Sequence, residues 1–113
     1  MSTAPRTPGG GVGEYKNATV TRSGNSTSSV TSSFDVKSAF GIPEKVAKKL
    51  SAGNFFGQVT AYNINREHNY PNSLISCSIT SYVPSTGMLT VRCAGNYSEI
   101  LITRYQVHAV WAE

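Results

Sequence analysis

Acidic residues are scarce in this sequence: six Asp and Glu residues stand against ten Lys and Arg, and charged residues make up 14% of its 113 residues. The acids are scattered singly, so they form neither the carboxylate pair of acid–base catalysis nor a cluster suited to a metal ion. The glycine run near the N-terminus belongs to no strand–helix unit and therefore does not predict a phosphate-binding loop. From these absences we expect no catalytic activity, no metal and no cofactor.

Histidine and cysteine are equally scarce, with two of each. Cys77 and Cys93 are too far apart, and too far from a histidine, to predict a zinc site. His68 and His108 are not spaced from a nucleophile or a carboxylate as a catalytic pair requires. We expect both histidines to lie at the surface.

Long apolar runs are also missing, because none approaches the ~20 residues of a membrane-spanning helix. The first residues, Met1-Ser-Thr-Ala-Pro-Arg, lack the hydrophobic stretch of a secretory signal. We therefore expect a protein that is made and used in the cytoplasm or released by lysis, with no membrane partner. The formal charge of +4 comes mostly from scattered residues. A nucleic-acid-binding surface would show a basic stripe beside exposed aromatics, so we do not expect a nucleic-acid partner.

Gly, Ser, Thr, Asn and Tyr are plentiful, a balance that favours strands and turns over helices. Residues 1–13, MSTAPRTPGGGVG, hold almost nothing to bury. Such a segment predicts an extended N-terminal arm that orders on contact with a partner. We expect its Pro8, Gly9, Gly10 and Gly11 to make assembly contacts, and residues 14–113 to form a single domain.

Alternating patterns predict strands at 14–22, 30–37, 55–64, 74–83, 88–94 and 99–112, with a polar loop at 23–29. One short helix is expected at about 43–52, where Pro43 suits the first helical position and Val46 and Leu50 share a face. Strands at this spacing indicate an all-β fold, a compact antiparallel β-sandwich or barrel with one short helix.

The last predicted strand carries apolar side chains on both faces. Leu101, Tyr105, Val107 and Trp111 share one face, and Ile100, Ile102 and Val110 share the other. Because a sheet with one solvated face needs only one apolar set, we expect part of the Ile100, Ile102 and Val110 face to form a subunit contact. Trp111 is expected in the domain core.

Cys77 and Cys93 fall on adjacent strands of the predicted hairpin and on the same side of it, so a disulfide is within geometric reach. With no secretory signal, we favour two reduced thiols that pack as small apolar residues.

The polar loop at 65–72 carries Arg66, His68 and Tyr70. Hydrogen-bonding groups beside an aromatic ring would suit a sugar-binding loop. Such loops are also ordinary connections between strands.

The arm, the strands rich in Ser, Thr and Asn, and the hairpin ITSYVPSTGMLTVRC from Ile79 to Cys93 resemble the small structural proteins of tailed bacteriophages. These include capsid decoration, collar and tail-fibre proteins. The resemblance implies a non-enzymatic virion protein whose partners are other virion proteins and copies of itself. A carbohydrate- or receptor-binding β-sandwich that recognises a surface glycan is the alternative.

Overall fold

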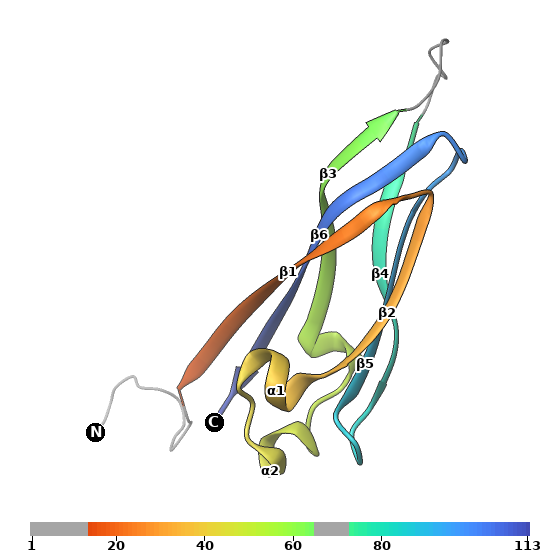
Figure 1. Cartoon of the computed structure of the whole chain (residues 1–113). Coiled ribbons are helices and arrows are strands. Elements are labelled where there is room, and N and C mark those ends of the chain that lie inside the picture. Colours follow the sequence, from red (N-terminus) through yellow and green to blue (C-terminus); the bar gives the residue numbers. More distant parts are fainter. Residues whose placement is uncertain (1–13, 65–72) are drawn as a thin grey trace.

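The structure is a computed structural model that describes residues 14–64 and 73–113. Two antiparallel sheets of three strands each make up most of it, with strand orders β1-β6-β3 and β2-β5-β4 (Figure 1). The strands are β1 (Tyr15–Thr27), β2 (Ser29–Asp35), β3 (Phe55–Ile64), β4 (Ile75–Val83), β5 (Met88–Gly95) and β6 (Ile100–Ala112). The prediction of an antiparallel all-β fold is confirmed, and among these residues the sheets do not close into a barrel.

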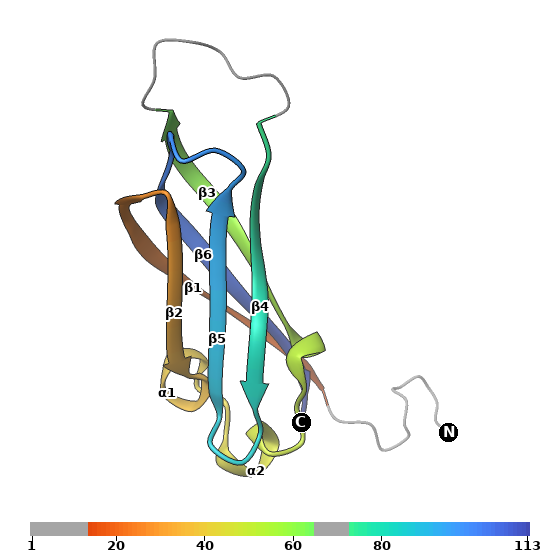
Figure 2. The ribbon, with the colours of Figure 1, turned by 90° about the vertical axis from the view of Figure 1, so that its right-hand side faces the viewer.

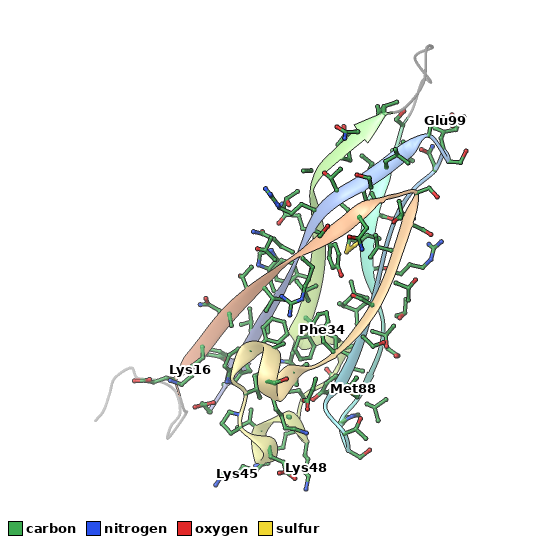
Figure 3. All side chains as sticks on the ribbon, viewed as in Figure 1. Lys16, Phe34, Lys45, Lys48, Met88 and Glu99 are labelled. Carbon is green, nitrogen blue, oxygen red and sulfur yellow. A yellow bond between two sulfur atoms is a disulfide. The ribbon has the colours of Figure 1, made fainter. Side chains whose placement is uncertain are left out.

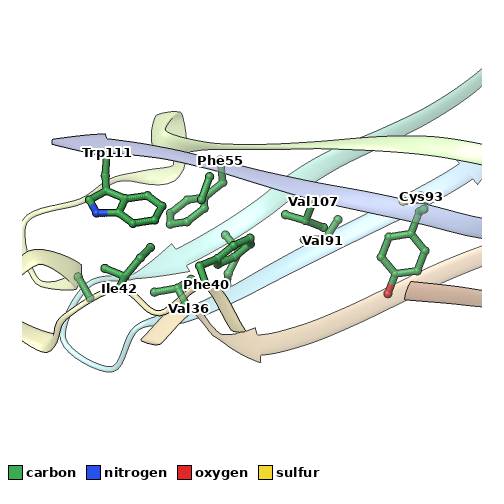
Figure 4. Close-up of a cluster of buried hydrophobic side chains, with 12 residues drawn as sticks. Val36, Phe40, Ile42, Phe55, Val91, Cys93, Val107 and Trp111 are labelled. Atoms are coloured by element: carbon green, nitrogen blue, oxygen red, sulfur yellow. The ribbon is translucent and has the colours of Figure 1, made fainter. Parts of the chain in front are cut away.

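The two sheets lie in layers, with the strands of one crossing behind those of the other (Figure 2). Strand alternation turns one face of each sheet inward. Leu89, Val91 and Cys93 of β5 and Val107 of β6 are at most 1% exposed. The shared core also takes in the helical segments, and Figure 4 shows it filled at the helical end by Phe40, Phe55 and Trp111.

Three short helices replace the single helix expected at about 43–52: α1 (Val36–Phe40), α2 (Glu44–Ala47) and the 3-10 helix η1 (Ala52–Asn54). The predicted helix is therefore present only in part, as α2, and α1 was not predicted. The Asp35 carboxylate accepts a hydrogen bond from the Lys37 amide and so ends β2 and starts α1. Gly41, with φ of 73°, ends α1 in a left-handed conformation.

A hydrogen bond connects α2 to the sheet β2-β5-β4. In it, the Tyr82 hydroxyl on β4 donates to the Ala47 carbonyl oxygen. Burial, and secondarily the charge of Asp35, raise the pKa of Tyr82, so the hydroxyl stays protonated and able to donate. Tyr82 also packs its ring against Phe55, with centroids 5.1 Å apart.

Strand β1 runs through the segment that was expected to be a polar loop at 23–29. Asn25 and Ser26 have φ of 57° and 54°, and the register shifts between Ser23 and Thr27. The chain therefore bulges without leaving the sheet. Gly24 makes this possible, because a Cβ atom there would lie 2.3 Å from the Ile102 carbonyl oxygen.

Ile100 and Ile102 are fully buried within their own chain, both 0% exposed, so the prediction that they form a subunit contact is wrong. Strand β6 changes phase between Tyr105 and Ile102: its step from Arg104 to Ile102 contains one more residue than the facing step on β3, from Ala61 to Tyr62. That extra residue turns both isoleucines to the inward side occupied by Tyr105 and Trp111. Trp111 is buried at 5% exposure, as predicted, whereas Val110 remains 43% exposed.

This difference predicts opposite outcomes for two truncations on the same strand. Ile102→Ala should lower the free energy of unfolding by about 2–5 kcal/mol, because it leaves a cavity in the core. Val110→Ala should change it by no more than ~0.5 kcal/mol, because the side chain is half in solvent. Denaturant titration of both purified variants measures the two values. Equal losses would contradict the phase change in β6.

Candidate functional site

The outer face of the sheet β1-β6-β3 gathers exposed apolar side chains from all three strands. Phe56 on β3 is 53% exposed, Val110 on β6 is 43% exposed and Tyr15 on β1 is 76% exposed. Residues that pair across strands share a face, and diagonal neighbours lie close enough for aromatic side chains to touch. His108 pairs with Phe56, and Ala112 pairs with Tyr15, so Val110 is the diagonal neighbour of both aromatic residues.

These residues form a diagonal stripe, and we call Tyr15, Phe56, His108 and Val110 the outer patch. An apolar group of this kind with a polar rim is typical of an interaction surface.

His108 holds the centre of the outer patch in place through contacts to both neighbouring strands. Its ring stacks on Phe56, with centroids 4.6 Å apart and planes 24° apart. Its Nε2 lies 3.2 Å from Gln58 Oε1 and its Nδ1 lies 2.9 Å from Thr19 Oγ1. Because an amide oxygen only accepts, Nε2 donates to Gln58, and in the neutral ring Nδ1 accepts from the Thr19 hydroxyl. The ring orientation is therefore set by hydrogen bonds on both sides.

The outer face of the sheet β2-β5-β4 has a different character. Its middle is built of small hydroxyl side chains around Arg92, and Ser33 and Thr90 are joined there by a hydrogen bond of 2.8 Å. Its exposed apolar residues, Val83 and Met88, are a cross-strand pair at the hairpin end. The two outer faces thus differ, and the apolar patch that spans three strands lies on the β1-β6-β3 sheet.

The residues expected at functional positions are only partly brought together. Val110 lies in the outer patch, while Ile100 and Ile102 belong to the core. The arm residues Pro8, Gly9, Gly10 and Gly11 and the loop residues Arg66, His68 and Tyr70 lie outside the described residues. Sequence reasoning missed Phe56, although the adjacent Phe55 and Phe56 on one strand must point to opposite faces.

Cys77 and Cys93 are joined in a disulfide, so the prediction of two reduced thiols is wrong. The prediction weighed the cellular compartment, but the register decides the outcome. The two cysteines are direct partners on β4 and β5. Across the core, Gly57 of β3 leaves room for the bridge, since a Cβ atom there would lie 2.5 Å from Cys77 Sγ.

The disulfide closes a loop with a sequence separation of 16 residues, which predicts a stabilisation of about 3 kcal/mol. Dithiothreitol should therefore lower the Tm of the oxidised protein by about 10 °C or more, measured by circular dichroism. The Cys77→Ala/Cys93→Ala variant is the control, and its Tm should not respond to the reductant. Free thiols in the untreated, denatured protein would contradict the bridge.

In residues 14–64 and 73–113, no group of three or more His, Cys, Asp or Glu side chains is placed to hold a metal ion. The helices of the described segments are all too short or too polar to cross a membrane. No protein-family model, curated protein or solved structure matches the chain.

Proposed function

We propose that this protein is a non-enzymatic structural component of a virion, a capsid decoration or a tail or collar subunit built as a β-sandwich. It binds neighbouring subunits through the outer patch and through its N-terminal arm. The observation that carries the proposal is the outer patch, a set of apolar side chains that one chain leaves in water on a regular sheet face. The stylistic resemblance of the sequence to small phage proteins supplies the setting.

The energetics suit a repeated, multivalent contact. Covering a residue such as Phe56 contributes about 1.5–3 kcal/mol, which is too little for a stable pairwise complex. Repetition on a symmetric particle turns many such contacts into lasting attachment. An arm such as residues 1–13, with the run Pro8 to Gly11, adds area at low affinity per contact.

A charge placed in the outer patch tests this role. Phe56→Asp should leave the fold intact, because the side chain is half exposed, and should lower the copies per purified particle about tenfold or more. Copy number is measured by quantitative mass spectrometry of particles made in cells that express the variant. Thr31→Asp, on the outer face of the other sheet, is the matched control and should be incorporated normally.

Deletion of residues 1–13 tests the contribution of the arm independently of the outer patch. In the same assay, this deletion should also reduce incorporation. If neither the deletion nor Phe56→Asp changes the copy number, the proposed assembly role is overturned.

The stacked pair of Phe56 and His108 favours one second function, a carbohydrate-binding module. Sugar rings pack their C–H faces on flat aromatic surfaces and need hydrogen-bonding groups at the rim. Gln58 and Thr19 supply such groups beside the ring pair. The sequence alone suggests a different place for this function, the loop residues Arg66, His68 and Tyr70.

A glycan array distinguishes the second function from the first. If the outer patch binds sugar, the wild-type chain should give specific hits that Phe56→Ala loses and Phe56→Trp keeps, because Trp preserves the stacking surface. Hits that survive Phe56→Ala but vanish with Tyr70→Ala would move the sugar site to the 65–72 loop. An array without hits would count against this function and leave the assembly role in place.

A further inference from the structure

A pocket of about 480 Å³ lies between the helical segment and the last residues of β6. It adjoins the outer patch, because Asn54 at its wall donates a hydrogen bond to the Val110 carbonyl oxygen. Its lining residues are Lys45, Val46, Lys49, Leu50, Asn54, Ala112 and Glu113.

The charges around this pocket are unbalanced. Lys48 pairs with Glu44 at 3.5 Å. Within residues 14–64 and 73–113, no carboxylate forms an ion pair with Lys45 or Lys49. Figure 3 shows Lys45 and Lys48 projecting from the helical end of the molecule. Among the described residues, the pocket lining thus carries two ammonium groups, neither of them in an ion pair, and one side-chain carboxylate, that of Glu113.

The other polar groups of the lining, Glu113 and Asn54, already make hydrogen bonds. Glu113 accepts a hydrogen bond of 2.9 Å from Trp111 Nε1. The Asn54 side chain accepts from the Ser51 amide at 2.9 Å while it donates to Val110. The remaining lining residues are apolar: Val46, Leu50 and Ala112. A fitting ligand has an apolar body over these three residues and a negative charge beside the lysines, away from Glu113.

We propose that this pocket binds an acidic, apolar peptide segment of a different protein. The inference rests on the proposed assembly function and names the chemistry of the partner. The segment places an apolar side chain against Val46 and Leu50 and a carboxylate between Lys45 and Lys49. The arm of a second copy does not fit, because residues 1–13 contain no Asp or Glu and include Arg6.

The electrostatic part of the interaction is exposed, so salt should weaken it strongly. Glu113 sets the direction of the bound segment, because its carboxylate repels a second one placed nearby. Neutralising Glu113 should therefore strengthen binding, and neutralising the lysines should weaken it.

The test uses the full-length chain and a synthetic probe peptide, acetyl-Leu-Asp-Leu-Asp-Leu-amide, in a titration followed by amide NMR shifts. We expect shifts confined to 45–54 and 110–113, and a dissociation constant that rises with salt. The uncharged control peptide, in which both Asp residues are replaced by Asn, should bind at least about fivefold more weakly. Lys45→Gln/Lys49→Gln should lose a similar factor, while Lys48→Gln, which removes an adjacent but paired lysine, should not.

Equal binding of the acidic and neutral peptides, or shifts that leave the pocket residues unchanged, would overturn the inference. Particle assembly is a separate readout. Peptide binding in the pocket together with normal incorporation of Phe56→Asp and of the arm deletion would support the pocket and reject the assembly role. Loss of incorporation in those variants, without any peptide binding, would reject the pocket alone.

Discussion

The packing of β6 against β5 is the interaction on which the rest of the structure depends. Strand β6 is hydrogen-bonded on both sides, between β1 and β3, and its inward residues meet Leu89, Val91 and Cys93 of β5 in the core. Because strand side chains alternate with a period of two, burying Val107 and Trp111 obliges His108 and Val110 to face outward. A slip of one residue would exchange the two sets. The same strand register therefore determines both which side chains form the core and which form the outer patch.

Much of the strand pattern could be predicted because alternation is a local property. Strand β3 has the predicted bounds, and the hairpin of β4 and β5 is within two residues of its expected limits. The departures arose where a distant partner decides the outcome. The polar segment 23–27 stays in the sheet because Gly24 lets the chain approach Ile102, a residue far away in the sequence. The phase change in β6 depends on a bulge against β3, which apolar counting on one strand does not detect.

The residues of the candidate site likewise divide into those that one strand's pattern predicts and those that depend on a distant partner. Val110 was recognised because its own strand carried too many apolar residues for one face. Phe56 could not be recognised from its own strand, because its place in the outer patch depends on stacking against His108 of the neighbouring strand. That Lys45 and Lys49 form no ion pair could be seen only from the positions of all the charged side chains among the described residues. A sequence suggests which side chains are surplus to the core, whereas only the fold shows which of them lie side by side.

The close approach of Gly57 to Cys77 makes the core narrower at the disulfide than at the helical end. At the helical end, the rings of Phe40 and Phe55 lie 5.9 Å apart and Phe55 packs on Tyr82, so wide side chains separate the sheets. At the disulfide, a sulfur atom meets bare backbone. In related sequences, aromatic residues at the wide end could exchange for one another, but a larger side chain at position 57 would need the volume that sulfur now fills. Position 57 and the cysteine pair should therefore covary during evolution.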